Sequence, residues 1–118
     1  MSYITKSYQE MMTEMDDMID KALGETERYV LYSAYETDEF DRPINNLEKT
    51  PVKGKIKFIS EDYEWESEVY DSPTWLDIAV IANKMIIGTQ DYNNKYLEDI
   101  DIFDSKNGIT TAYLFMGS

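Results

Sequence analysis

Residues 72–88 read SPTWLDIAVIANKMIIG, and this stretch decides the fold because ten of the thirteen residues at 75–87 are apolar. Only Asp77, Asn83 and Lys84 interrupt it. As a helix it would be buried almost all round, since Asp77 and Lys84 lie seven residues apart on one narrow stripe. A pair of buried strands is the alternative, because Ile and Val also favour strands. We expect a core helix here.

The ends of this stretch carry the signals of helix termini. Ser72 or Thr74 can cap the first turn, and Thr74 with Asp77 fits a capping box. Pro73 suits the first helical position, and Gly88 can end the helix. The flanking residues therefore agree with the apolar pattern between them.

Residues 8–23 place apolar side chains, four methionines among them, at helical spacing and predict a first, amphipathic helix. Ser7 and Glu10 fit a capping box at its start, and Gly24 can end it. The methionines are either ordinary core or an adaptable contact surface. The opposite face is either simply solvated or a binding face, since three of its acids stand where the helix dipole disfavours negative charge. The acids of this face are Glu10, Glu14, Asp16, Asp17 and Asp20.

Residues 28–35 are rich in strand-forming side chains and predict the first strand. Residues 36–53 then form an eighteen-residue loop, and a loop of that length inside a compact domain is usually functional or disordered. Its single aromatic residue, Phe40, is either a short docking element or an anchor folded back onto the core. The acids that flank it are Asp38, Glu39 and Asp41.

Residues 54–70 predict a hairpin whose turn is centred on 61–62. The expected pairs are Phe58 with Trp65, Lys57 with Glu66, Ile56 with Ser67 and Lys55 with Glu68. Period-2 alternation then sorts the side chains into two faces. The inward set is Ile56, Phe58, Tyr63, Trp65 and Val69. The outward set is Lys55, Lys57, Glu64, Glu66 and Glu68.

Residues 96–103 and 109–116 predict a second hairpin, joined by 104–108, where Asn-Gly supplies the positive φ that such a turn needs. We expect Asp99 and Asp101 to face solvent, and the isoleucines that alternate with them to face the other way. The C-terminal part of the chain is therefore expected to be all strand.

The whole chain, 1–118, is expected to form a single α+β domain in the order α-β-β-β-α-β-β. At 118 residues it is long enough to bury a core without disulfides, and it contains no cysteine. The sheet is predicted to be largely antiparallel and to pack on the buried second helix. The long acidic loop at 36–53 belongs to this domain.

The residue types missing from the chain narrow its chemistry. It has neither histidine nor cysteine, so the usual near-neutral proton shuttle and the commonest metal ligands are missing. Two patterns loosely resemble a calcium loop, Asp99-x-Asp101-x-x-Asp104 and the segment 104–108. In the second, Lys106 stands at position three, where a ligand is needed. No glycine-rich phosphate loop occurs either. We expect no enzyme, cofactor or metal, with a carboxylate-based or tyrosine-based enzyme as the exception that the residues allow.

The charge of the chain points to a class of partner. Twenty-four acidic against eleven basic residues give a net charge of −13, which opposes binding to nucleic acid or anionic lipid and favours a basic protein. No basic segment followed by an apolar run opens the chain, and no apolar stretch of about eighteen residues occurs. We therefore expect neither a signal peptide nor a membrane span, and a cytoplasmic location.

Glu64, Glu66 and Glu68 form the most regular acidic pattern. On one strand face they would stand at intervals of about 6.8 Å, twice the rise per residue. Such a row could imitate a nucleic-acid backbone and occupy the groove of a protein that binds nucleic acid. Alternatively, Lys57 and Lys55 on the facing strand neutralise two of the three charges.

These features lead to the hypothesis of a small acidic inhibitor that neutralises a basic, nucleic-acid-handling protein by partial nucleic-acid mimicry. In composition, and not in any motif, the chain resembles phage-encoded counter-defence proteins and bacterial immunity proteins against nuclease toxins; a phage origin would place it in the host cytoplasm. The alternative is a small-ligand binding or sequestering protein with a tyrosine-lined pocket, in one chain or between protomers of a homo-oligomer. The expected partner contacts are Glu10, Glu14, Asp17, Asp20, Asp38, Glu39, Phe40, Asp41, Glu64, Glu66 and Glu68.

Overall fold

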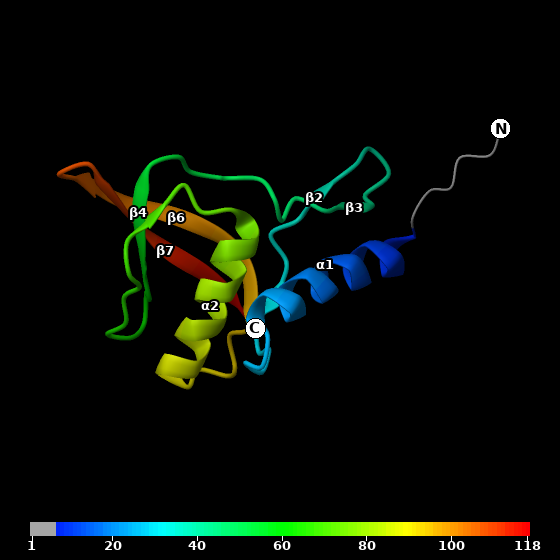
Figure 1. Cartoon of the computed structure of the whole chain (residues 1–118), viewed down its shortest axis with the longest axis horizontal. Coiled ribbons are helices and arrows are strands. Elements are labelled where there is room, and N and C mark those ends of the chain that lie inside the picture. Colours follow the sequence, from blue (N-terminus) through cyan, green and yellow to red (C-terminus); the bar gives the residue numbers. More distant parts are fainter. Residues whose placement is uncertain (1–6) are drawn as a thin grey trace.

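α2 (Trp75–Thr89) is the helix that residues 72–88 predict, and the computed structural model, which describes residues 7–118, packs the other elements around it (Figure 1). Its capping box forms as expected. Thr74 Oγ1 accepts the Asp77 N–H at 3.2 Å, and the Asp77 carboxylate accepts the Thr74 N–H at 3.0 Å. The alternative of two buried strands is therefore wrong.

Two predictions about the ends of α2 are wrong. Pro73 precedes the cap residue and is not the first helical residue. Gly88 lies inside the helix, which ends at Thr89 with Gln90 in the left-handed conformation (φ 59°). Gly88 instead lets the Trp65 indole approach, because an added Cβ would lie 3.0 Å from Trp65 Nε1. Close packing, and not helix termination, explains this glycine.

Asn83 is the polar residue that ties α2 to the rest of the fold. It is 0% exposed, and its Oδ1 accepts the N–H of Tyr29 at 2.7 Å and that of Val30 at 2.9 Å. Its Nδ2 donates to the Glu27 carbonyl at 2.9 Å. The sequence pattern showed Asn83 only as an interruption of an apolar run, whereas its amide fixes the chain that leads into β1 (Leu31–Tyr32).

α1 (Tyr8–Leu23) forms as predicted, with Ser7 as its cap. Ser7 Oγ accepts the Glu10 N–H at 3.2 Å. At the other end Gly24, with φ 62°, donates its N–H to the Asp20 carbonyl at 3.1 Å. Three of the four methionines are buried or pack against the core, so the apolar face of α1 is mainly core and not a free contact surface.

Within residues 7–118, five strands form one mixed sheet in the order β1-β6-β7-β4-β5. The bounds of those not yet given are β4 Lys55–Ile59, β5 Tyr70–Asp71, β6 Tyr96–Lys106 and β7 Ile109–Gly117. β4 with β5, and β6 with β7, pair antiparallel, but β1 is parallel to β6 and β4 is parallel to β7. The α+β class is confirmed. The sheet, predicted to be largely antiparallel, is mixed, and the predicted order α-β-β-β-α-β-β misses a short hairpin within 36–44. Both parallel pairs arise because the hairpin of β6 and β7 inserts between β1 and β4.

The register predicted for 54–70 is also wrong. The observed partners are Lys55 with Asp71, Ile56 with Tyr70 and, as an isolated bridge, Ile59 with Glu66. Ser67 explains the change, because its hydroxyl accepts the Phe58 N–H at 2.8 Å in place of a strand carbonyl. Apart from the single bridge, residues 60–69 form no regular strand.

The face predictions for this hairpin hold in part. Ile56 and Phe58 are buried and Trp65 packs against the core, as expected, whereas Tyr63 and Val69 are exposed. The outward set is exposed or half-buried throughout: Lys55, Lys57, Glu64, Glu66 and Glu68. The three glutamates nevertheless form no regular row, because the segment that carries them is not a strand.

β6 and β7 are longer than predicted. They continue to a two-residue turn at Asn107 and Gly108, with φ 56° and 77°, in place of the expected five-residue connection. The register shifts by one residue at Glu98 and again at Phe103, so both are bulge residues of β6. The bulges explain why simple alternation along β6 fails beyond each of them.

The long loop is structured and carries a small hairpin of β2 (Glu36–Thr37) and β3 (Pro43–Ile44). Asn46, which follows this hairpin, fixes the chain to β1, because its Oδ1 accepts a hydrogen bond from the Tyr32 hydroxyl at 2.6 Å. Phe40, at the hairpin tip, is 67% exposed and is therefore not an anchor folded back onto the core. α1 and this hairpin project together from the side of the sheet (Figure 1).

Replacing Asn83 with Leu should destabilise the protein by about 3 kcal/mol or more, because three backbone groups would lose their partners at about 1–3 kcal/mol each. Urea unfolding followed by circular dichroism measures the change. Asn93→Leu, at an exposed position, is the control and should change the free energy of unfolding by less than about 0.5 kcal/mol. Equal stability of the two variants would contradict the role assigned to the Asn83 amide.

Candidate functional site

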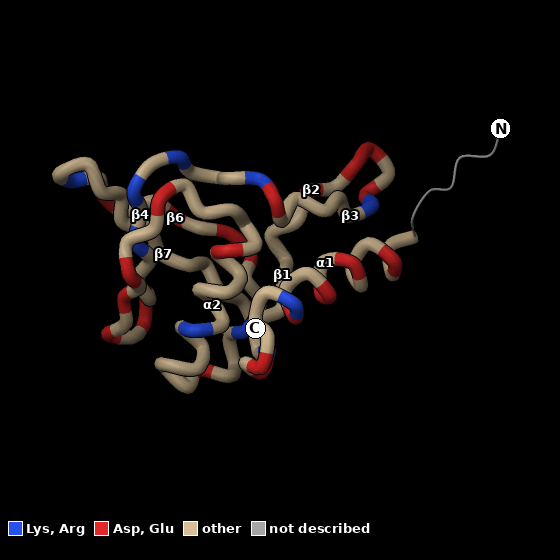
Figure 2. Tube along the Cα trace, in the orientation of Figure 1, with Lys and Arg blue, Asp and Glu red and all other residues tan. Residues whose placement is uncertain are grey.

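α1 and residues 36–46 form what we call the acidic arm. The two parts are joined by packing between α1 and β3 and by a hydrogen bond from Asn45 Nδ2 to Glu14 Oε1 at 3.1 Å. Figure 2 shows the acidic residues of α1 and of the hairpin tip on these neighbouring elements. The structure therefore brings together two of the three groups of predicted contact residues.

The arm has a large excess of negative charge. Residues 7–46, which comprise the arm and the chain that connects its two parts, carry eleven acidic and three basic residues. Arg28 forms ion pairs with Asp20, at 2.6 Å from Nε to Oδ1, and with Asp16, at 3.6 Å. Arg42 forms an ion pair with Asp38, at 2.8 Å from Nε to Oδ2. Two of the three cations in this region are thus already paired. Lys49, which lies outside the region, also pairs with Glu36 at 2.7 Å, and the other acids dominate the field around the arm.

The acids of α1 divide into two stripes. Glu10, Glu14 and Asp17 follow one line of the helix, at steps of about 6 Å and about 4.5 Å along the axis. Asp16 and Asp20 lie on the flank that meets Arg28. Burial raises the pKa of Asp16, and the Arg28 guanidinium opposes that rise. Asp20, which was predicted as a partner contact, forms an ion pair with Arg28 within the chain.

The hairpin tip is organised by the carboxylate of Asp38. Its Oδ1 accepts the N–H of Phe40 at 2.8 Å and that of Arg42 at 3.0 Å. The hydrogen bond from the Arg42 N–H is the main reason that the pKa of Asp38 is lowered, and the bond from the Phe40 N–H adds to it. The Arg42 guanidinium also lies over the Phe40 ring, 5.0 Å from its centre. Glu39 and Asp41 remain exposed beside this fixed aromatic ring.

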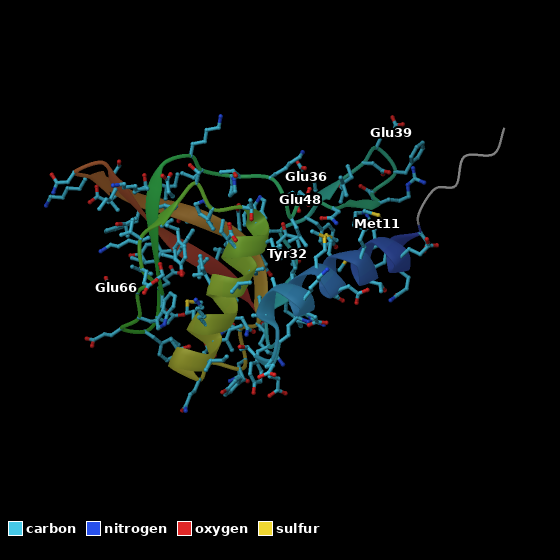
Figure 3. The ribbon with its side chains drawn as sticks, in the orientation of Figure 1. Met11, Tyr32, Glu36, Glu39, Glu48 and Glu66 are labelled. Atoms are coloured by element: carbon cyan, nitrogen blue, oxygen red, sulfur yellow. The ribbon has the colours of Figure 1, made fainter. Side chains whose placement is uncertain are left out.

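The third predicted group lies elsewhere. Figure 3 places Glu66 at the opposite end of the molecule from Glu39. Glu66 forms the predicted ion pair with Lys57, at 3.4 Å, in spite of the changed register. Glu64 and Glu68 belong to the same irregular segment. The eleven predicted contacts therefore lie on two separate surfaces.

A surface that sequence reasoning missed is the face of β6 and β7 that the helices do not cover. Phe103 and Phe115 are exposed on these strands, 62% and 49% respectively. The acidic side chains of β6 and the alternating aromatic side chains of β7 were visible in the sequence. Their meaning depends on which face of the sheet the helices cover, and that is a property of the tertiary structure.

The cavities of the described residues are shallow or small. An open hollow of about 550 Å³ runs along the exposed side of α1, and a more enclosed cavity near the end of α2 measures about 70 Å³. In residues 7–118 no group of three or more acidic, histidine or cysteine side chains is placed to hold a metal ion. None of the helices in this described range combines the length and the hydropathy needed to cross a bilayer.

Comparison with protein-family models, with curated proteins and with solved structures finds no match to this chain or its fold. The surfaces described above are therefore the basis for inferring a function.

Replacing Asp38 with Ala should make the hairpin tip mobile, because the N–H groups of Phe40 and Arg42 lose their common acceptor. Amide order parameters from NMR relaxation should fall at 39–42. The lowered pKa of Asp38 predicts the same loss in the native protein at low pH: the tip is stabilised above the usual carboxylate pKa and loosens as the pH falls through the lower, folded-state value. Glu39→Ala is the control, and a loosened tip in that variant as well would contradict the assignment to Asp38.

Proposed function

We propose that this protein binds and inhibits a basic, nucleic-acid-handling protein through the acidic arm, by partial imitation of nucleic acid. The observation that carries the proposal is the charge of residues 7–46, with eleven acids against three bases of which two are already paired. A field of one sign over one projecting element steers a basic partner to it and raises the association rate.

The line of Glu10, Glu14 and Asp17 supports imitation of a phosphate backbone. The helix fixes the backbone positions of the three residues along one line, so on binding only their side-chain torsions lose freedom. Their axial steps of about 6 Å and about 4.5 Å are longer than the axial rise of about 3.4 Å per phosphate in one strand of DNA. The three carboxylates therefore imitate the sign of the charge and its linear arrangement, but they do not match individual phosphates.

Phe40 supports a protein partner over a small cation. Its ring stands at the tip of the arm, between the exposed acids Glu39 and Asp41 and fixed from one side by Arg42. Exposed aromatic side chains of this kind are enriched at protein interfaces, where they fill apolar pockets of the partner. Glu39 and Asp41 would then form part of a polar rim around it.

The small-ligand alternative is supported less well by the cavities. The enclosed cavity of about 70 Å³ has Tyr63 as its one tyrosine, and ligand sites measure about 300–1,000 Å³. The larger hollow along α1 is open and is lined by residues of that helix alone. The described surface thus favours a macromolecular partner.

A charge-reversed arm tests the proposal against a matched control. The arm variant is Glu10→Lys, Asp17→Lys and Glu39→Lys; the control, with the same change in net charge at the other end of the molecule, is Glu61→Lys, Glu64→Lys and Glu68→Lys. All six positions are exposed, so both variants should fold, which circular dichroism checks. Each tagged protein is used to capture partners from source-cell lysate at roughly 0.1 M and roughly 0.5 M salt.

The unmodified protein should retain a basic nucleic-acid-binding protein at the lower salt and release it at the higher. The arm variant should bind that protein at least about 100-fold more weakly, because like-charge contacts cost several kcal/mol in an interface, while the control retains it. Capture of no basic protein at either salt would sink the proposed function. Equal binding by both variants would refute the arm as its site.

A further inference from the structure

The face of β6 and β7 turned away from the helices carries a row of aromatic rings. Phe103 and Tyr113 contact each other edge to face, with ring centres 5.4 Å apart. Phe115 follows two residues after Tyr113 and so lies on the same face of β7. Tyr96 continues the row at the far end of β6 and is also exposed. We call these four residues the aromatic row.

Carboxylates accompany the aromatic row along β6. Asp99 stands directly opposite Phe115, and Asp101 directly opposite Tyr113, so each carboxylate has a ring as its cross-strand neighbour. Both aspartates are exposed, as the sequence predicts. None of the ion pairs found within residues 7–118 involves either of them. The face therefore presents rings and unpaired negative charges in alternation.

Two of the acids also shield the free edge of β6. β1 covers this edge only at Tyr96 and Leu97. Beyond them Asp99 Oδ1 accepts the Ile100 N–H, and Asp104 Oδ1 accepts the Ser105 N–H, each at 2.8 Å. Together with the two bulges these bonds oppose the addition of another strand.

A second copy of this chain is a poor occupant of the face. Two such faces in contact would oppose aspartates to aspartates in a protein that carries a net charge of −13. Exposed rings and unpaired carboxylates instead fit a cationic group with a flat apolar surface. Among protein side chains the arginine guanidinium has both properties, because it stacks on rings and bonds carboxylates through paired N–H groups.

We propose that the face formed by the aromatic row with Asp99 and Asp101 binds an arginine-bearing segment of a protein partner. The chain contains the same combination at the hairpin tip, where Arg42 lies 5.0 Å from the centre of the Phe40 ring and 2.8 Å from Asp38. On the sheet, the aromatic row and the two aspartates supply the rings and the carboxylates, and the partner would supply the arginine. This surface is distinct from the acidic arm, and the proposal does not rest on the function proposed for the arm.

The test is an NMR titration of the isotope-labelled full chain with two synthetic peptides of equal length and charge, an arginine–glycine repeat and a lysine–glycine repeat, at roughly 0.1 M salt. The arginine peptide should shift the amides of 96–104 and 111–117 and bind roughly threefold to tenfold more tightly than the lysine peptide, since stacking on the rings adds to the charge attraction. Equal affinities, or shifts confined to 7–46, would overturn the proposal.

Two variants separate the rings from the carboxylates. Replacing Phe103, Tyr113 and Phe115 with Thr removes both rings that face the aspartates, keeps strand-forming residues at the three positions, and should abolish the preference for arginine while leaving the lysine peptide's affinity within about twofold. Asp99→Asn with Asp101→Asn should weaken both peptides. Retained arginine preference in the folded ring variant would also overturn the proposal, whatever is found for the partner of the arm.

Discussion

The buried amide of Asn83 is the interaction on which the rest of the structure depends. An apolar helix packs well but gives no direction to the chain around it, whereas this amide bonds two N–H groups and one carbonyl of residues 27–30. Those bonds place the chain that enters β1, and β1 in turn lies parallel to β6 at the edge of the sheet. A short side chain with both donor and acceptor is required, because a carboxylate would bury a charge and a leucine would leave three backbone groups unpaired.

The effect of the negative charge depends on where the acidic residues lie on the surface. Arg28, Arg42, Lys49 and Lys57 each neutralise acids close to them, and the exposed side of α1 and the hairpin tip remain negative (Figure 2). The uncovered face of β6 and β7 differs in kind, because exposed aromatic rings accompany the charges there. The arm suits long-range attraction of a basic partner, and the sheet face suits short-range recognition of a planar cation. A partner that met both would combine a fast encounter with a specific contact.

The helices, their caps at Ser7 and Thr74 and the existence of both hairpins could be predicted from the sequence, since each depends on residues within a few positions of one another. The register of 54–70 could not, because the Ser67 hydroxyl replaces a strand carbonyl and β4 takes β7 as its second partner. The candidate site was also predicted in part. The sequence named its acidic residues and Phe40, and the structure brings the α1 group and the loop group together. Of the ion pairs formed by Asp20, Asp38 and Glu66, only that of Glu66 with Lys57 was predicted.

By itself the sequence determined the α+β class, the buried helix with its capping box, the strong negative charge and the absence of histidine and cysteine chemistry. The tertiary structure alone decided the strand order, the parallel pairs, the nearness of α1 to the β2–β3 hairpin and the exposure of the aromatic row. The physical reason is range. A helix satisfies its backbone within four residues along the chain, whereas each strand must choose among distant partners, and that choice is made by packing on α2 and by which polar groups would otherwise be buried without a partner.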